Sequence, residues 1–400
     1  MEIDEFSAAW SYNGSTNQPT DDTAQLDALL QWMGPNNLRT SSLEPHHFPE
    51  TGRGMRATQD LAAGTRLISV TSPFCYTAAR ARLFRPEIPP HLLEHPLDCL
   101  IIFLMLEDQL GAASCVAPYL RSLPRTFTNP LFSLRGRIPQ EICSESTDLL
   151  RRQRGELFSS WRRVSATFCH LAEAVRVGME LEKFIWAFFV VNTRTLYVTA
   201  TEPALVPFLD LFNHSPVARV QTRWNGAEDA FEIITECRYQ AGEQVFINYG
   251  AHDNMNLAIH YGFTMPRNPL SEVLFDLGDV AKKLPVTTAQ RDFLRSYGAW
   301  RPLSCSWSGF SQTAKLFLAS RLVRSSDFWK TVDVEDLVDD RTTRLALVEL
   351  LCDAHRDLAN FAERASAVPL LQTVYLEMMD ILHENLRVLE ESSGIVSDTV

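Results

Sequence analysis

Hydrogen-bonding side chains are concentrated between residues 209 and 216, where the sequence reads LDLFNHSP. Asn213, His214 and Ser215 follow an apolar stretch and directly precede a proline. Such a cluster can bind a polar ligand, but Asx-type turns would explain Asn213 and Ser215 without one. The cluster alone leaves both interpretations open.

A second candidate is the small-residue turn Thr51-Gly52-Arg53-Gly54. Its two glycines permit a ligand to approach the backbone closely. A plain turn explains the same residues, and no third glycine follows to complete the phosphate-binding pattern G-x-G-x-x-G. The turn is therefore a candidate only in combination with other residues.

Aromatic residues form the third group. Tyr249 stands at the end of an alternating apolar stretch, directly before Gly250, and Tyr261 and Phe263 follow twelve and fourteen residues later. Each of these rings could equally belong to the hydrophobic core.

The segment HLLEH, residues 91–95, has the H-x-x-E-H spacing with which some peptidases bind zinc. That chemistry requires both imidazoles on one face of a helix. Pro89 and Pro90 precede the segment and Pro96 follows it, so any helix here is barely one turn long. We therefore expect two exposed histidines in a linker, and no metal site.

Short strands are expected on both sides of these candidates. Residues 56–70 predict two strands with a turn at Gly64, because the residues after the glycine alternate. A second β region runs from residue 231 to 250, and residues 240–243 form a connection of a length common in hairpins.

Helical spacing covers much of the remaining chain. A short helix is predicted from residue 22 to 33, and the first twenty residues, rich in small polar types, predict a mobile tail. Residues Leu371, Val374, Met378, Leu382, Leu386 and Leu389 follow one face of the last predicted helix. The other predicted helices cover residues 99–110, 146–177, 180–191, 312–323 and 341–365, and the last covers 369–391.

Composition excludes several classes of protein. A net charge of -12 argues against sequence-independent binding to nucleic acid, because a basic surface supplies most of that affinity. No apolar run approaches the roughly 20 residues of a membrane-spanning helix, and the first ten residues show no signal peptide. Eight cysteines without a CxxC pair predict reduced thiols, in the cytoplasm, the nucleus or both.

Taken together and in order, four blocks of sequence resemble the SET-domain protein methyltransferases, in particular the Rubisco large-subunit methyltransferase-like class. A further stretch, residues 100–124, is similar to the helical insertion of that class and ends in its PYLxxLP signature. The four blocks are TGRGMRATQDLAAGTRLISV (51–70), VNTRTLYV (191–198), PFLDLFNHSP (207–216) and AGEQVFINYGAHDNMNLAIHYGFTMPRNP (241–269).

The resemblance implies an α+β fold. We expect a SET-domain β core over residues 21–270, a helical insertion at about 78–188, and an all-α substrate-binding domain over 271–400. The change of character after Pro269 agrees with a boundary near residues 265–275.

The resemblance also implies roles for individual residues. Thr51 stands where relatives often have an acidic residue, so the resemblance carries over the backbone role of the turn and not the side-chain contact of that acidic residue. Tyr249 matches the catalytic tyrosine, and Tyr261, Phe263 and Asp210 would line the substrate side. The residues expected to bind S-adenosylmethionine are Thr51, Gly52, Arg53, Gly54, Arg194, Asp210, Asn213, His214 and Tyr249.

The activity implied is S-adenosylmethionine-dependent N-methylation of a protein lysine, in a histone or another protein. Methylation of a histidine, or a non-catalytic SET scaffold, are the alternatives. We expect a protein partner with a lysine-bearing segment, suited by its basic character to the acidic chain, and no direct binding of nucleic acid or membrane. A monomer is expected.

Overall fold

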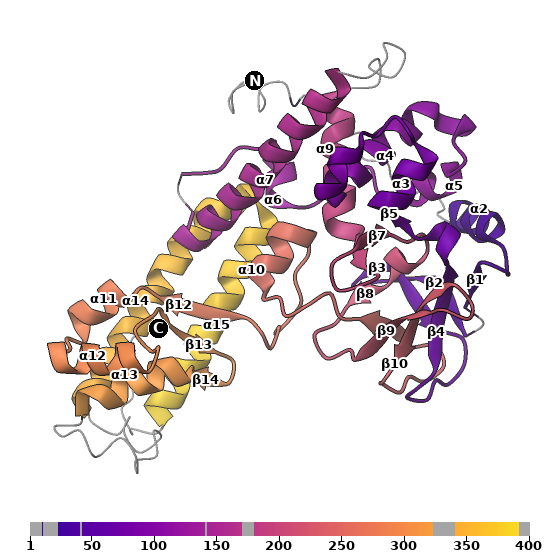
Figure 1. Cartoon of the computed structure of the whole chain (residues 1–400). Coiled ribbons are helices and arrows are strands. Elements are labelled where there is room, and N and C mark those ends of the chain that lie inside the picture. The colour runs from indigo at the N-terminus through magenta and orange to yellow at the C-terminus, as the bar shows by residue number, and fades with distance from the viewer. Residues whose placement is uncertain are drawn as a thin grey trace. The chain divides into compact units, whose positions relative to one another are not determined.

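The computed structural model describes residues 10, 23–40, 42–140, 142–169, 180–322 and 341–391. The chain divides into two compact units. The first consists of Met1–Arg137 and Leu150–Ala251, and the second of Ile138–Leu149 and His252–Val400. Figure 1 labels the elements of both units.

Three small sheets form the β part of the first unit (Figure 1). One has the strand order β1-β4-β10-β9, with every pair antiparallel. The second has the order β2-β3-β11-β8, in which β8 and β11 are parallel, and the third has the order β5-β7-β6. The strands are β1 (Leu38–Arg39), β2 (Leu43–Phe48), β3 (Gly52–Ala57), β4 (Arg66–Thr71), β5 (Tyr76–Thr77), β6 (Leu196–Tyr197), β7 (Pro203–Leu205), β8 (Asn213–His214), β9 (Val220–Asn225), β10 (Ala230–Thr235) and β11 (Gln244–Ile247).

Of the two strands predicted over residues 56–70, the second is confirmed as β4, and Gly64 before it has a positive φ of 89°. The first is wrong in its position, because β3 overlaps the predicted region only at Arg56 and Ala57. The prediction of a hairpin between residues 231 and 250 is wrong, because β10 and β11 belong to different sheets. The loops after β3 and before β11 instead pair with each other. Leu61 and Tyr239 exchange two backbone hydrogen bonds of 2.8 and 3.0 Å, and this directs β11 onto β3 rather than back onto β10.

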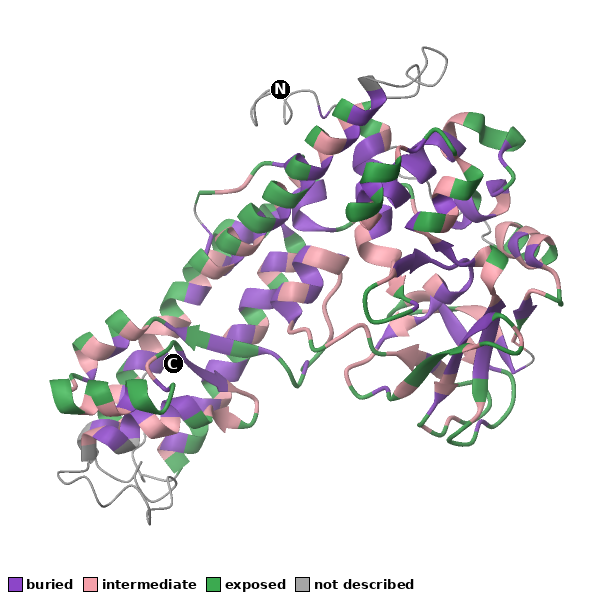
Figure 2. Cartoon of the chain, viewed as in Figure 1, coloured by how far each residue is buried: buried purple, intermediate pink, exposed green. Residues whose placement is uncertain are grey.

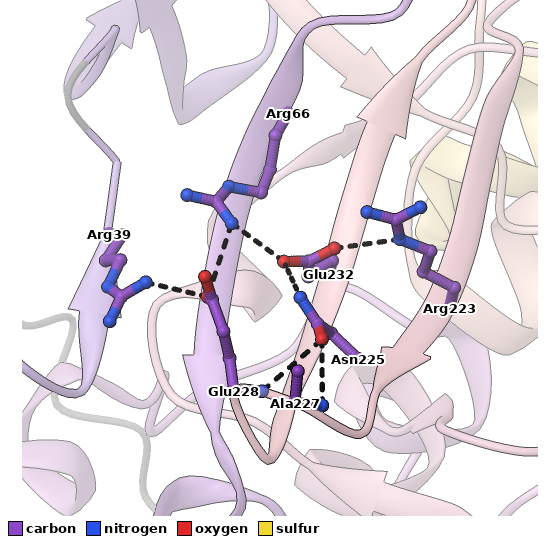
Figure 3. A network of polar contacts seen from close by, with 7 residues as sticks. All are labelled: Arg39, Arg66, Arg223, Asn225, Ala227, Glu228 and Glu232. Carbon is purple, nitrogen blue, oxygen red and sulfur yellow. Dashed lines mark hydrogen bonds and ion pairs between the residues drawn. The ribbon is translucent and has the colours of Figure 1, made fainter.

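A buried carboxylate lies between the strands of the first sheet (Figure 3). The side chain of Glu232, on β10, has an exposed fraction of 0%. Its Oε1 accepts hydrogen bonds from Arg66 Nη1 at 2.9 Å and Asn225 Nδ2 at 3.0 Å, and its Oε2 accepts one from Arg223 Nε at 2.8 Å. Burial alone would raise the pKa of Glu232, but these three donors outweigh it and lower that pKa.

Helices gather at one end of this β part (Figure 1). Helix α4 is buried on all sides from Asp98 to Glu107, as Figure 2 shows, and Gly111, with a φ of 54°, ends it. Its buried Asp98 pairs with Arg163 of α7. The helices are α2 (Thr23–Met33), η1 (Ser72–Phe74), α3 (Ala78–Phe84), η2 (Pro90–Glu94), α4 (Pro96–Leu110), η3 (Gly111–Ala113), α5 (Ala117–Ser122), α6 (Pro130–Ser133), α7 (Ser144–Cys169, whose first residues belong to the second unit), α9 (Leu181–Arg194) and η4 (Leu209–Leu211).

The helices predicted near residues 22–33, 99–110 and 180–191 are confirmed as α2, α4 and α9. The one predicted over 146–177 is confirmed as α7 up to Cys169, and its remainder lies outside the described residues. Of the predicted tail, only Trp10 is described. Trp10 is not mobile surface: it is 1% exposed, and its ring lies 5.8 Å from that of Phe132.

The second unit is mainly helical, as predicted, and also contains a three-stranded sheet, β12-β13-β14, which the sequence analysis missed. All six residues predicted on one face of α15 are buried. No helix in the described part of the chain is long and apolar enough to cross a membrane. The elements are α10 (Asn254–Asn256), η5 (Leu257–Tyr261), β12 (Glu272–Phe275), α11 (Leu277–Lys283), α12 (Thr288–Ser296), β13 (Leu303–Ser306), β14 (Gly309–Phe310), α13 (Gln312–Leu322), α14 (Arg341–Arg364), η8 (Ala365–Ala367) and α15 (Pro369–Glu391).

Candidate functional site

The small-residue turn predicted at residues 51–54 is only partly a turn: Thr51 ends the turn after β2, and Gly52, Arg53 and Gly54 are the first residues of β3, paired with β2. This 51–54 turn segment is closely packed. Gly52 has a φ of 69°, a conformation that favours glycine. A Cβ atom on Gly54 would lie 2.5 Å from Gln244 Nε2 and 2.9 Å from Asn213 Nδ2, so a side chain there would displace its neighbours. Thr51 Oγ1 donates a hydrogen bond of 2.9 Å to Gln244 Oε1. Both glycines are therefore required by the local geometry.

Strand β8 brings Asn213 to this turn. β8 lies beside β11, and β11 lies beside β3, so Asn213 reaches across one strand. Its Nδ2 donates to the carbonyl oxygens of Arg53 at 3.1 Å and Thr51 at 3.4 Å. The amide thus holds the backbone of the turn in place, a role for which the sequence pattern gave no indication.

His214 and Tyr249 are joined by two interactions. The backbone N–H of Tyr249 donates to His214 Nδ1 at 3.1 Å, and the two rings stack with centroids 5.2 Å apart. Because Nδ1 accepts this bond, a neutral His214 carries its proton on Nε2. The Tyr249 hydroxyl donates to the carbonyl oxygen of Phe212 at 2.5 Å, so its proton is fixed and its lone pairs can accept.

A buried ion pair lies behind this strand. Arg194, the last residue of α9, donates from Nη1 to the Asp210 carbonyl oxygen at 2.9 Å and lies 3.6 Å from Asp210 Oδ2. The Asp210 side chain is 2% exposed, and burial raises its pKa although Arg194 and Arg53 oppose that shift. Among the described residues, Asp210 Oδ1 and Arg194 Nε are buried without a hydrogen-bond partner. Such atoms are costly unless a ligand satisfies them.

Three supporting residues were missed by the sequence analysis. The Tyr119 hydroxyl donates a hydrogen bond to Asp210 Oδ2 at 3.3 Å. The Ser122 carbonyl oxygen accepts a hydrogen bond of 2.9 Å from Arg53 Nη2. Both belong to α5 and to the PYLRSLP segment, so the signature was visible but its role was not. The third, Phe208, is buried with a φ of 72°, a strained conformation for a non-glycine residue that sets the turn before Asp210.

The H-x-x-E-H segment has no zinc-binding geometry. Residues Pro90–Glu94 form the short helix η2, and His95 caps the following helix α4, so His91 and His95 do not share one helix. Among the described residues, no group of three or more metal-ligating side chains is placed to hold an ion.

Tyr261 and Phe263 belong to the second unit and form a group of their own. Tyr261 ends the helix η5, and Gly262 follows with a φ of 83°. The Tyr261 ring lies 6.3 Å from the Phe263 ring and 5.4 Å from the imidazole of His252. The second unit thus gathers three aromatic side chains within twelve residues of chain.

Comparison with known proteins agrees with this arrangement. The SET domain model matches residues 52–250, which contain both glycines of the turn, the ion pair, His214 and Tyr249. SET domain-containing protein 4 of Homo sapiens is 31% identical over 81% of this chain and 79% of its own length. The chain belongs to the SET-domain family. The corresponding protein of Mus musculus is 29% identical over 92% of this chain and 91% of its own length.

Solved SET-domain structures share the fold. The SET domain of LSMT bound to lysine and AdoHcy matches with a TM-score of 0.57 at 16% identity, over 94% of this chain and 93% of that one. Within the family, the actin-histidine N-methyltransferase of Mus musculus is 24% identical over 62% of this chain and 44% of its own length. This SET-domain chain is thus of the methyltransferase class.

In the SET-domain chain, the predicted site residues fall into two groups. The first unit brings together Tyr249, its neighbours on β8, the residues 51–54 and the Arg194–Asp210 pair. Tyr261 and Phe263 lie in the second unit. The roles assigned to each residue stay predictions.

Proposed function

We propose that the protein is an S-adenosylmethionine-dependent protein-lysine N-methyltransferase. The observation that carries this proposal is the Tyr249 hydroxyl, fixed by the Phe212 carbonyl and placed beside His214 within the SET-domain region. A hydroxyl held in this way can orient a reacting group without being consumed.

The residues of the first unit fit the cofactor. S-adenosylmethionine supplies a methyl group on a sulfonium, and its amino-acid portion carries an ammonium and a carboxylate. Asp210 Oδ1 can accept from the ammonium and Arg194 Nε can donate to the carboxylate, and both atoms are buried without a partner among the described residues. Residues 51–54 and Asn213 would hold the rest by their backbone. Solved Rubisco LSMT, which shares the fold, has been determined bound to AdoMet.

The chain's own task is to make the acceptor amine neutral and to orient it. A lysine with the ordinary pKa of about 10.4 pays about 4 to 5 kcal/mol for deprotonation near pH 7. An apolar, aromatic surrounding lowers that cost, because it disfavours the ammonium. We assign Tyr261 and Phe263 to this surrounding, with Asp210 near the acceptor side, and the Tyr249 hydroxyl to orienting the amine.

Lysine is the proposed acceptor because structures of the SET domain of LSMT hold lysine and methyllysine and match over more than nine-tenths of this chain. Histidine is the second candidate, supported by the actin-histidine N-methyltransferases among the relatives. We further propose a monomer in the cytoplasm, the nucleus or both. Its net charge of -12 favours a lysine-bearing segment of basic character and disfavours nucleic acid.

The test is transfer of radiolabelled methyl from S-adenosylmethionine into a protein extract, followed by mass spectrometry of the labelled residue. We expect label on lysine and at least a hundredfold slower labelling by Tyr249→Phe. Tyr239→Phe is the matched control, since that hydroxyl also lies near a backbone carbonyl, Phe246 O at 3.5 Å. Label on histidine would overturn the acceptor. Cofactor binding without any transfer would favour a non-catalytic scaffold.

A further inference from the structure

A network of buried polar groups encloses the segment that carries Tyr261 and Phe263. Asn254 and Asn268 are 2% and 0% exposed. Asn254 Oδ1 accepts from Met265 N at 2.9 Å, and its Nδ2 donates to Met265 O at 2.7 Å. These two bonds join the chain on either side of the two aromatic residues, so residues 254–265 form a closed loop.

Asn268 closes the loop a second time. Its Nδ2 donates to His252 O at 3.0 Å and to Asn254 Oδ1 at 3.3 Å, and its Oδ1 accepts from Leu270 N at 3.0 Å. Each amide therefore uses both of its donors and its acceptor. A fully satisfied buried network of this kind holds one conformation, because any movement leaves a buried group unpaired.

Glu377, on helix α15, ties this loop to the carboxy-terminal helices. Its Oε2 accepts from Asn254 Nδ2 at 2.6 Å and Ser271 Oγ at 3.0 Å, and its Oε1 accepts from Asn268 N at 3.1 Å. Burial raises the pKa of this carboxyl, and its three hydrogen bonds oppose the shift. The carboxylate of Glu377 thus accepts hydrogen bonds from three residues at the two ends of the segment 254–271.

We propose that Glu377 is a positioning residue, which holds residues 254–271 so that Tyr261 and Phe263 stay in place for the acceptor side chain. The inference rests on the proposed function, because that function assigns these two rings to the acceptor. It gives the carboxy-terminal helices a part in catalysis besides the binding of a protein substrate.

Glu377→Gln is the variant of choice. A glutamine can offer one oxygen to Asn254 and Ser271, but its amide then faces the N–H of Asn268, donor against donor. We expect methyl incorporation into the protein extract to slow about tenfold, since misplacement of about 1 Å costs up to a hundredfold. Amide hydrogen exchange within residues 254–271 should quicken, and affinity for S-adenosylhomocysteine should stay within about twofold.

Asp380→Asn provides the matched control. Asp380 lies one turn further along α15 and is exposed, so the charge change is the same without the network. We expect no change in labelling or exchange. Ser271→Ala, which removes one bond to Glu377, provides a milder variant with an intermediate effect should Glu377→Gln unfold.

The outcomes separate this inference from the proposed function. Wild-type transfer with an equal rate in Glu377→Gln would overturn the positioning role alone, whether or not exchange quickens. A slower rate with unchanged exchange would overturn it too, because the loop would then be held without Glu377. No transfer by the wild-type protein would overturn the function and, with it, the inference.

Discussion

Two buried carboxylates of the first unit have the same chemistry and opposite pKa shifts. Glu232 accepts three hydrogen bonds, two of them from arginines, and its pKa is lowered (Figure 3). Asp210 has one longer bond from Tyr119 and an arginine at 3.6 Å, and its pKa is raised. A carboxylate that is satisfied by the protein stabilises the fold, whereas one left with a free lone pair is suited to a ligand.

When each of these two carboxylates is replaced by an amide, the largest expected effect is on cofactor binding. In Asp210→Asn, the acceptor proposed for the cofactor ammonium loses its charge, and affinity for S-adenosylhomocysteine should fall about a hundredfold, or about 2.7 kcal/mol. Titration calorimetry measures it. Glu232→Gln is the control and should bind as the wild type does. Equal affinity in Asp210→Asn would remove Asp210 from the cofactor site.

The next largest effect is on the free energy of unfolding. Here Glu232→Gln should be the more affected variant and Asp210→Asn the less affected one. Glu232→Gln places an amide against Arg66, Arg223 and Asn225, and should lower the free energy of unfolding by about 2 kcal/mol. Asp210→Asn should not lower it, since burial already disfavours the charge on Asp210. Chemical unfolding followed by circular dichroism compares them. A greater loss of unfolding free energy in Asp210→Asn than in Glu232→Gln would contradict the stabilising role assigned to Glu232.

A smaller effect is expected in the pH dependence. The pKa of Glu232 is lowered, so its ionised carboxylate stabilises the fold. This contribution to the free energy of unfolding is complete above the ordinary glutamate pKa of about 4.3 and is lost as the pH falls below it. The stability gap between wild type and Glu232→Gln should therefore narrow by about 1 kcal/mol at the acid end. The pKa of Asp210 is raised, so the free energy needed to keep its buried carboxylate ionised grows as the pH rises. The free energy of unfolding of Asp210→Asn should therefore increase relative to that of the wild type as the pH rises. Unfolding midpoints from about pH 2 to about pH 7 test both signs, because the loss for Glu232 falls below its ordinary pKa.

The smallest effect is expected at the turn. Thr51→Ala removes an exposed hydrogen bond to Gln244 and leaves the backbone carbonyls that bind Asn213. Stability should change by less than about 0.5 kcal/mol and cofactor affinity by less than about twofold. A larger change in titration calorimetry would show that the Thr51 side chain, and not only the backbone, takes part.

Much of this architecture follows from the sequence, and the exceptions have physical causes. Helical periodicity located α15, which buries one face, whereas α4 and α9 were predicted from long apolar stretches and are buried without a break over eight or more residues. Strand pairing could not be predicted in the same way: β10 and β11 are close in sequence but belong to different sheets. Sheet partners depend on distant residues, and local patterns carry little information about them.

The candidate site was predictable only where a motif marks it. Gly54, Asn213 and Tyr249 lie in such motifs, and the structure brings them together through β3, β11 and β8. The hydrogen bonds that distinguish Asp210 from Glu232, and those that join Glu377 to Asn254, link residues 91, 166 and 123 positions apart. No spacing rule reaches such distances.

The second unit is discontinuous in sequence, with consequences for its folding during synthesis. Residues Ile138–Leu149 belong to it, yet their partners come much later. Ser146 bonds to the hydroxyl of Tyr375 at 2.7 Å, across 229 positions. A ribosome that has made the whole first unit must still add most of the last 150 residues before Ser146 finds that partner. Until then this stretch exposes apolar surface, so we expect nascent chains stalled near residue 370 to be a preferred target of chaperones.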